Sequence, residues 1–238
     1  SIYNYITSTY KAEFDYRNYF DPATRFMRGR DSRKGWRTPF NAFASTHRAD
    51  DYCEGNAWQY TWLVPHDVHG LIGLFGGEEP FLRKLRTLFV IEGDLGDTAD
   101  DVTGLIGQYA HGNEPSHHMA YLYNYVGMPW RTQELTRRLL DEMYAPTPEG
   151  IIGNEDCGQM SAWYIFSSLG FYPVCPGSNE FVLTTPLFDR TTVRLANGRT
   201  LIVTADNPRR NRYIDAVTLD GVPVEANFVT YEQLMQGG

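Results

Sequence analysis

Apolar residues in the first part of the chain recur three or four positions apart, which is the spacing of helices that bury one face. The first helix that this pattern predicts is carried by Ile2, Tyr3, Ile6, Tyr10 and Phe14. Further apolar segments, separated by glycine, proline or asparagine, predict helices at residues 57–63, 68–75, 81–90, 119–125, 133–143 and 160–169. Residues 16–50 predict a long loop rich in aromatic side chains.

The pattern changes near residue 181, where short β-branched runs replace the helical spacing. These runs are separated by turn sequences such as Asn197-Gly198 and Asp220-Gly221, which favour tight hairpins. The sequence therefore predicts a helical part over residues 1–178 and a small antiparallel β element over residues 179–238. Helix pairs joined by long, chemically dense loops favour an α/α toroid, or half of one, over a plain helical bundle with short loops.

Composition indicates a globular protein. Of the 238 residues, 42% are hydrophobic and 14% are aromatic, and no run of about 20 apolar residues predicts a membrane span. The formal charge of −8 argues against nucleic acid as a partner, because binding to phosphates requires a basic face. Aromatic residues near acids are typical of sugar sites, and equally of aromatic-rich cores.

The ends and the cysteines say little about cell location. The chain begins at Ser1 without a methionine or signal peptide and ends on "LMQGG", which predicts a piece of a longer protein. Cys53, Cys157 and Cys175 show no CxxC spacing and do not decide the redox compartment.

The segment from Gly153 to Tyr164, "GNEDCGQMSAWY", places Glu155 and Asp156 side by side before an apolar run. Helix capping would account for both acids, because the first N–H groups of a helix lack partners and attract negative charge. Three further dense segments lie upstream, which favours a functional site.

The segment "EGNAWQYTW" places Glu54 before a helix on which Trp58 and Trp62 share one face. A carboxyl beside an apolar aromatic wall favours its protonated form, which suits a proton donor. The alternative is a capping acid above a tryptophan-packed core. A third segment, "PHDVHG", places His66 beside Asp67, either as an orienting pair or as a helix start.

The segment "HGNEPSHH" combines three histidines with two oxygen donors, Asn113 and Glu114. The histidine spacing does not match known zinc motifs. Oxygen donors at a turn suit a hard cation such as calcium, although the EF-hand pattern is missing. The chain has no G-x-S-x-G, P-loop or G-x-G-x-x-G motif, which argues against serine hydrolases, NTPases and dinucleotide-binding enzymes.

Together, "EGNAWQYTWLVPHDVHGL", "HGNEPSHHMAYLYNYVGMPW" and "GNEDCGQMSAWYIFSSLGFYPVCPGS" resemble glycoside hydrolase family 92, a family of calcium-dependent exo-acting α-mannosidases. The resemblance runs from about Tyr16 to the end of the chain. It implies an N-terminal β-sandwich followed by an (α/α)6 barrel. This chain would be mainly α, part of the (α/α)6 toroid with its small C-terminal β element, and would lack the sandwich and the earlier barrel helices.

The resemblance also implies catalytic roles. Glu54 of "EGNAWQY" would protonate the leaving glycosidic oxygen, and Asp156 of "GNEDCGQ" would deprotonate water. Asn154 stands where some relatives have a second aspartate that assists the base. The family reaction inverts configuration, which requires two carboxyls roughly 6.5–9.5 Å apart. Only the toroid would bring Glu54 and Asp156 that close.

Calcium is the cofactor that the resemblance implies, held in part by Asn113 and Glu114 and bridging O2 and O3 of the sugar. Gly112 stands where members that cut α-1,2 linkages tend to have a glutamate, so α-1,3, α-1,4 and α-1,6 linkages stay open. The presence of Glu54 argues that the chain is not one of the relatives that cleave mannose-1-phosphate linkages, because that leaving group needs less protonation by an acid. The residues expected to contact substrate are Trp58, His111, Gly112 and His117.

The expected partners are α-mannoside glycans, such as mannans or N-glycans, and the expected location is outside the cytoplasm, as for the mostly bacterial family members. Two alternatives stay open. The chain could bind sugar or calcium without catalysis because a partner domain is missing. It could also be a zinc metalloenzyme that uses His111, His117 and His118.

Overall fold

The computed structural model describes residues 14–33, 35–46, 51–94 and 102–237, and the helix predicted at residues 2–14 lies almost wholly outside these ranges. The chain forms two compact units, Ser1–Ala110 and His111–Gly238, which are described separately. Within the described ranges, no helix has both the length and the apolar character needed to cross a bilayer.

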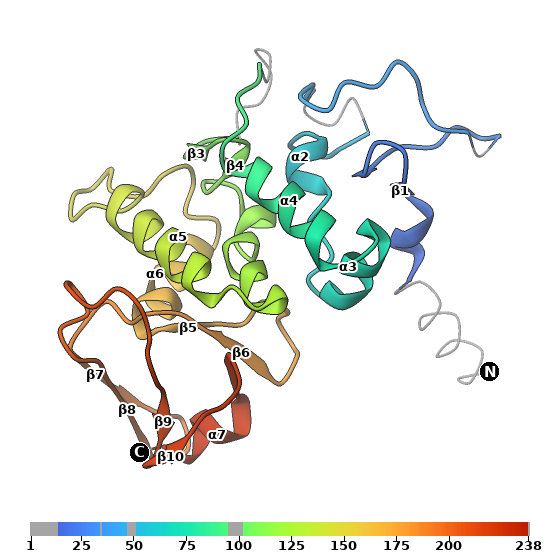
Figure 1. Ribbon diagram of the computed structural model, residues 1–238. Helices are drawn as coiled ribbons and strands as arrows, with labels where there is room; N and C mark the ends of the chain where they lie inside the picture. The colour runs from blue at the N-terminus through green and yellow to red at the C-terminus, as the bar shows by residue number, and fades with distance from the viewer. Residues whose placement is uncertain (1–13, 34, 47–50, 95–101, 238) are drawn as a thin grey trace, which may run out of the picture. The chain divides into compact units, whose positions relative to one another are not determined.

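The first unit contains short helices and two small antiparallel hairpins (Figure 1). The strands pair β1 with β2 and β3 with β4. In chain order, the elements are η1 (Asp15–Asn18), β1 (Phe20–Asp21), β2 (Phe26–Met27), α2 (Ala57–Tyr60), α3 (Val68–Phe75), α4 (Glu78–Leu88), β3 (Leu105–Ile106) and β4 (Tyr109–Ala110).

The helices of the first unit begin and end at residues that suit those positions. Asp67 caps α3 by accepting a hydrogen bond from the Gly70 N–H at 2.8 Å, and Gly76 ends the helix with φ of 90°. Helix α3 therefore has the predicted bounds. Helix α2 ends at Tyr60, three residues earlier than predicted, because the N–H groups of Leu63 and Val64 bond to carbonyls three and two residues back, which forms a turn.

Aromatic rings form the core of the first unit. Trp62 is fully buried and stacks on Phe75 with ring centroids 5.5 Å apart, and Phe81 contacts both rings edge-on. Phe20 packs on Phe75 as well. These contacts join β1, the turn that follows α2, and helices α3 and α4.

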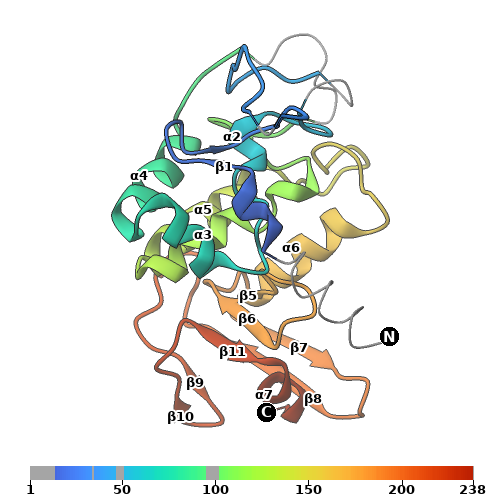
Figure 2. The same ribbon diagram turned by 90° about the vertical axis from the view of Figure 1, so that its right-hand side faces the viewer.

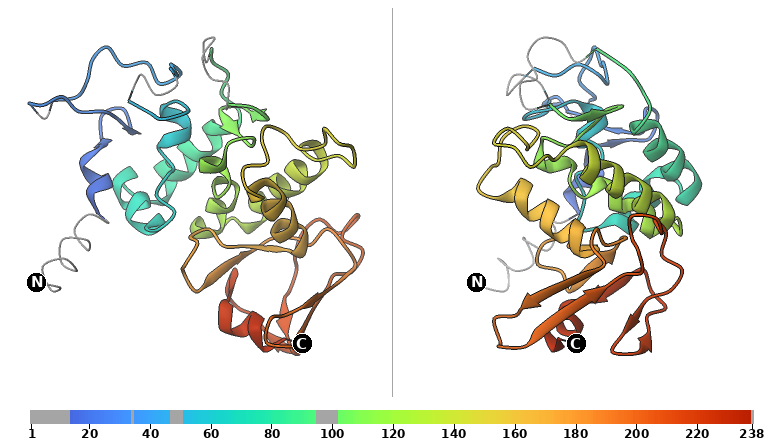
Figure 3. Two further views of the ribbon diagram at one scale, coloured as in Figure 1. Left: turned by 180° about the vertical axis from the view of Figure 1, so that it is seen from behind. Right: turned by 90° about the vertical axis from the view of Figure 1, so that its left-hand side faces the viewer.

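The second unit combines helices with the antiparallel strands expected near its C-terminal end (Figures 2 and 3). Both figures show α6 next to β5, which follows it directly. The elements are η2 (Glu114–Ser116), η3 (Met119–Val126), α5 (Pro129–Glu142), α6 (Gln159–Leu169), β5 (Phe171–Tyr172), β6 (Glu180–Leu183), β7 (Arg190–Arg194), β8 (Thr200–Thr204), β9 (Thr218–Leu219), β10 (Val222–Pro223), β11 (Phe228–Thr230) and α7 (Tyr231–Gln236).

The strands of the β element are antiparallel and form a three-stranded sheet, β11-β6-β5, and two hairpins, β7-β8 and β9-β10. Strand β5 lies before residue 179, where the β element was predicted to begin. Helix α5 ties this element to the helices, because Thr136 bonds Thr184 at 2.6 Å and Arg137 donates to the Pro186 carbonyl at 3.0 Å. The change from helices to strands falls between the end of α6 at Leu169 and the start of β5 at Phe171, inside the second compact unit. The segment predicted as a helix at residues 119–125 is the 3₁₀ helix η3.

Candidate active site

Glu54 lies half-buried in the loop before α2, and its N–H donates to the Tyr60 hydroxyl at 3.1 Å. The residue that caps α2 is Asn56, whose side chain accepts from the N–H groups of Trp58 at 2.9 Å and Gln59 at 3.3 Å. The interpretation of Glu54 as the capping acid is therefore wrong. The catalytic role of Glu54 stays a prediction.

Trp58 belongs to the core of the first unit. Its ring meets Phe26 edge-on at 4.9 Å, and the Lys84 ammonium lies 4.2 Å from its centroid. Burial, with a smaller contribution from Arg25, lowers the pKa of Lys84 to about 8. The indole N–H of Trp58 is buried and has no hydrogen-bond partner among the described residues. A substrate contact for Trp58 stays a prediction.

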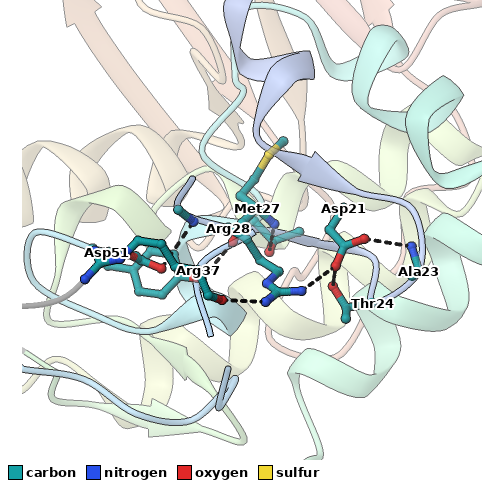
Figure 4. A network of polar contacts seen from close by, with 10 residues as sticks. Asp21, Ala23, Thr24, Met27, Arg28, Arg37 and Asp51 are labelled. Carbon is teal, nitrogen blue, oxygen red and sulfur yellow. Dashed lines mark hydrogen bonds and ion pairs between the residues drawn. The ribbon is translucent and has the colours of Figure 1, made fainter. Parts of the chain in front are cut away.

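The loop before Glu54 is held by four charged residues, here called the arginine network: Asp21, Arg28, Arg37 and Asp51 (Figure 4). The Arg28 guanidinium donates to Asp21 at 2.7 Å and to the Arg37 carbonyl at 2.8 Å, and Arg37 pairs with Asp51. Burial raises the pKa of Asp21, but hydrogen bonds from Arg28, Thr24 and Ala23 outweigh it, so the pKa lies below its ordinary value.

Gly29 and Tyr52 link this network to the segment that contains Glu54. The Gly29 N–H donates to Asp51 at 3.2 Å, and a Cβ at Gly29 would lie 2.3 Å from the Asp51 carboxyl carbon, so a side chain at this position would displace the Asp51 carboxylate. The Tyr52 hydroxyl donates to the Met27 carbonyl at 2.7 Å. A pocket of about 250 Å³ opens here, lined by Tyr16, Tyr19, Met27, Arg28, Gly29, Asp51, Tyr52, Tyr60, Leu63 and Val64.

His66 and Asp67 mark a helix start. Besides capping α3, the Asp67 carboxylate accepts from the Tyr16 hydroxyl at 2.7 Å and from Arg17 at 3.2 Å. The His66 ring meets Tyr16 edge-on at 5.6 Å. The partners of Asp67 are therefore structural, as the helix-start interpretation expected.

In the second unit, five side chains form what is here called the histidine network: His111, His117, Tyr144, Gln159 and Trp163. His111 Nε2 lies 2.8 Å from the Tyr144 hydroxyl, and His117 Nε2 lies 3.0 Å from the His111 carbonyl. Gln159 contacts His117 Nδ1 at 3.1 Å, and the Trp163 N–H donates to the His117 carbonyl at 3.0 Å. Gly112, between the two histidines in sequence, is buried as well.

Burial keeps both histidines neutral. It lowers the pKa of His117 to about 4, and it lowers the pKa of His111 well below its ordinary value, with a further contribution from His117. Both ring nitrogens of His117 are hydrogen-bonded to protein groups. The zinc alternative would need this ring as a ligand, so these contacts argue against it.

Asn113 and Glu114 lie at the start of η2, between the two histidines of the network. Their oxygens are hard donors of the kind that calcium prefers, but calcium takes about six to eight of them. Within the described ranges, no three His, Cys, Asp or Glu side chains gather where a cation could bind. The donor type therefore fits calcium, and further ligands would have to be carbonyls, water or sugar hydroxyls.

The two adjacent acids at the start of α6 have different surroundings. The half-buried Glu155 accepts from Ser161, at 3.0 Å from its N–H and at 2.9 Å from its hydroxyl. Asp156 is exposed, and its carboxylate has no hydrogen bond or ion pair within the part of the chain that the structure describes. Asn154 is also exposed. The N-cap residue of α6 is Gly158, but Glu155 accepts the N–H of the third helical residue and so caps the first turn, which leaves Asp156 for other chemistry.

The backbone around Asp156 is strained. Asp156 and Cys157 have φ of 46° and 57°, in the left-handed region that residues with a side chain seldom adopt. Gly158 follows with φ of 91°. In residues other than glycine, such conformations cost about 1–3 kcal/mol each and concentrate at functional sites. The turn presents Asp156 to solvent while the following amides bond back to residues 155 and 156.

The sequence patterns did not predict the supporting roles of Tyr144, Ser161 and Trp163. Tyr144 carries no sequence signal, because its partners are 33 and 16 residues away. Ser161 could have been found, since an acid six residues before a serine is compatible with a contact across the helix start. Cys53, Cys157 and Cys175 are all free.

Comparisons with known proteins point to the same family that the three sequence segments resemble. A model described as the glycosyl hydrolase family 92 catalytic domain matches residues 7–238. A family GH92 alpha-mannosidase from Bacteroides thetaiotaomicron is 43% identical with a TM-score of 0.86, over 93% of this chain and 29% of that one. In a second structure, that enzyme is in complex with mannoimidazole.

Two further relatives extend the comparison. An inverting family GH92 mannosidase from the same bacterium is 38% identical with a TM-score of 0.83, over 98% of this chain and 32% of that one. An uncharacterized secreted glycosidase from Arthroderma benhamiae is 29% identical over 83% of this chain and 24% of its own length. The chain thus spans less than two thirds of the relatives that it matches. Since the family model matches nearly all of its residues, the chain belongs to glycosyl hydrolase family 92, a family of glycoside hydrolases.

Proposed function

We propose that this chain carries the acid and the base of an exo-acting α-mannosidase that hydrolyses terminal α-linked mannose with inversion. The observation that supports it most is the contrast between neighbouring acids, since Glu155 caps α6 while the strained turn presents Asp156. Two of the similar structures are described as alpha-mannosidases or mannosidases, one of them as inverting. The proposal extends those descriptions to this chain.

The mechanism assigns one proton transfer to each acid. Glu54 donates a proton to the glycosidic oxygen as its bond to the anomeric carbon breaks. Asp156 takes a proton from the water that attacks that carbon from the opposite face, so the products are free mannose and the shortened glycan. Inversion requires the carboxyls to be roughly 6.5–9.5 Å apart. Glu54 and Asp156 belong to separate units, so this distance stays a prediction, as does an assisting role for Asn154.

Calcium is proposed as the cofactor, with Asn113 and Glu114 among its ligands. When bound, it would supply positive charge to sugar hydroxyls. The segment that contains Asn113 and Glu114 is held in place at both ends, because the histidine network fixes His111 and His117. His111, Gly112 and His117 are buried, so their expected contacts with substrate would require the sugar to reach an enclosed surface.

The proposed substrates are α-1,3-, α-1,4- or α-1,6-linked mannosides of mannans or N-glycans, because Gly112 offers no carboxylate to the leaving sugar. The proposed architecture is the later part of an (α/α)6 barrel that an N-terminal β-sandwich would precede. An extracytoplasmic location is also proposed, and one relative is described as secreted.

The second candidate is a sugar- or calcium-binding module without catalysis. It is favoured by the share of the relatives that this chain covers, 29% to 32% for the two mannosidases. In that case, the residues that position the sugar would come from elsewhere. Without those residues the sugar would be held in the wrong place, and a displacement of about 1 Å can lower the rate of hydrolysis about a hundredfold.

Hydrolysis tests both candidates. The native gene product that contains these residues is incubated with α-1,2-, α-1,3-, α-1,4- and α-1,6-mannobiose, and proton NMR follows the first anomer released. We expect β-mannose first, loss of activity on chelation, and recovery with calcium but not with zinc. Binding of mannose without turnover would favour the module, and α-mannose as the first product would contradict inversion.

A further inference from the structure

We propose that Tyr144 is a positioning residue that joins the predicted metal-binding segment, residues 111–117, to helix α6, whose preceding loop carries Asp156. This inference rests on the proposed function for its catalytic consequence. Tyr144 follows α5 and forms an isolated β-bridge with Ile151, so it comes from neither of the segments that it connects.

The direction of each hydrogen bond at Tyr144 follows from its partners. Its hydroxyl lies 3.1 Å from the Met160 carbonyl, which can only accept, so the single hydroxyl proton points there. The hydroxyl therefore accepts from His111 Nε2–H at 2.8 Å. The result is a chain of donors that runs from His111 through Tyr144 to the second residue of α6.

His117 attaches the other end of the same segment to the same helix. Its Nε2–H donates to the His111 carbonyl, so its Nδ1 accepts from the Gln159 amide. Gln159 is the first residue of α6, and Trp163, one turn later, donates to the His117 carbonyl. Residues 111 and 117 are thus both fixed on the first turns of α6.

Ring packing adds rigidity to these bonds. Tyr144 lies parallel to Trp163 at 6.0 Å with an interplanar angle of 2°, and His111 meets Trp163 edge-on at 4.4 Å. His111 and Trp163 are completely buried. Both ring nitrogens of His117 take part in the network, and His111 contributes its Nε2.

Asp156 shares this support through the start of α6. The Met160 N–H donates to the Glu155 carbonyl at 3.3 Å, and the Glu155 side chain bonds Ser161. Met160 therefore has the Asp156 loop on its N–H side and Tyr144 on its carbonyl side. A shift of residues 111–117 would therefore displace Met160 through Tyr144. Met160 would in turn displace the strained turn at Asp156.

The test compares Tyr144→Phe with Tyr164→Phe in the native gene product. Phenylalanine at position 144 keeps the ring packing and removes only the hydroxyl. Tyr164 is the matched control, because its ring contacts Tyr144 at 4.9 Å and its hydroxyl takes no part in the histidine network. Hydrogen exchange with mass spectrometry is followed in peptides that cover residues 111–118 and 154–161.

We expect Tyr144→Phe to speed exchange in both segments by roughly tenfold, as the loss of a buried hydrogen bond implies, and Tyr164→Phe to match the wild type. We also expect kcat on an α-mannobiose to fall by roughly 10- to 100-fold with KM little changed. Faster exchange confined to residues 142–151, or unchanged kcat despite faster exchange in both segments, would overturn the inference. If the wild-type protein hydrolyses no α-mannoside, the proposed function fails, and exchange alone decides whether Tyr144 couples the segments.

Discussion

The two predicted acids lie in segments that are held by different chemistry. The loop before Glu54 depends on the arginine network, in which Arg28 and Asp21 form an ion pair with both side chains under 10% exposed, at 8% and 4%. The histidine network of the second unit uses neutral groups, and the charged Glu155 lies outside it, at the helix start. One segment is thus secured by paired charges and the other by neutral donors and acceptors.

This difference determines how much stability each segment loses when one of its side chains is removed. A buried ion pair adds little stability over an apolar pair, but removal of one partner leaves a buried charge and is costly. A neutral hydrogen bond contributes about 0.5–1.5 kcal/mol, and its loss is correspondingly smaller. We therefore expect the loop before Glu54 to be more sensitive to single charge deletions than the segments around Asp156.

The largest expected effect is that of Arg28→Met. It leaves the buried Asp21 carboxylate without its guanidinium and should lower the free energy of unfolding by about 3–5 kcal/mol, measured by urea denaturation of the purified chain. The control is Arg33→Met, because Arg33 and Asp31 form an exposed pair with side chains 90% and 37% exposed, and this change should cost at most about 1 kcal/mol. Equal effects of the two variants would contradict the comparison.

A smaller effect is expected from Glu155→Ala, which removes the carboxylate that accepts from Ser161 at the start of α6. Loss of such a capping group costs about 0.5–2 kcal/mol, and amide exchange should accelerate in the first turn of α6. Glu149→Ala, in an exposed loop, is the control and should leave exchange unchanged. If both variants behave alike, Glu155 does not cap this helix.

A third prediction concerns Lys84 and the pH dependence of stability. Because burial lowers its pKa to about 8 from an ordinary value of 10.5, the unfolded chain binds more protons than the folded chain between these values. The contribution of Lys84 to folded-state stability should therefore rise with pH through this window, and Lys84→Met should remove that contribution. Competitive acetylation, compared with the unfolded chain, should place half-reaction of Lys84 near pH 8. Half-reaction above pH 10 would contradict the described burial of its ammonium.

Sequence patterns predicted most of the elements, because the signals are local. Helix α3 has its predicted bounds since Asp67 and Gly76 provide a start and a stop. Helix α7 was missed, although Thr230 and Gln233 form a capping box that is visible in the sequence. The aromatic loop at residues 16–50 contains the β1-β2 hairpin, whose two-residue strands are too short for a periodic signal.

The predicted site was recovered less completely, because its geometry depends on tertiary contacts. Capping and a site role were alternatives for the pair at residues 155 and 156, and the structure assigns capping to Glu155 alone. At the start of α2, the sequence did not show that Asn56 rather than Glu54 would be the cap. Tyr144 could not be predicted, since its role exists only where His111 and Met160 approach each other.

The central claim is that Glu54 is the acid and Asp156 the base, and leaving-group dependence tests it most directly. Rates of the native gene product are compared with those of Glu54→Gln, Asp156→Asn and Glu155→Gln, on an α-mannobiose and on 4-nitrophenyl α-mannoside. Glu54→Gln should lose about 100- to 10,000-fold on the disaccharide and far less on the activated substrate, because nitrophenolate departs without protonation.

Asp156→Asn should lose a similar factor on both substrates, since both reactions need an activated water, and Glu155→Gln should stay within about tenfold of wild type on both. That pattern would support the assignment of an acid and a base to the two units. An Asp156→Asn variant with wild-type rates, beside an inactive Glu155→Gln variant, would contradict the account, because the base would then be the acid that caps α6.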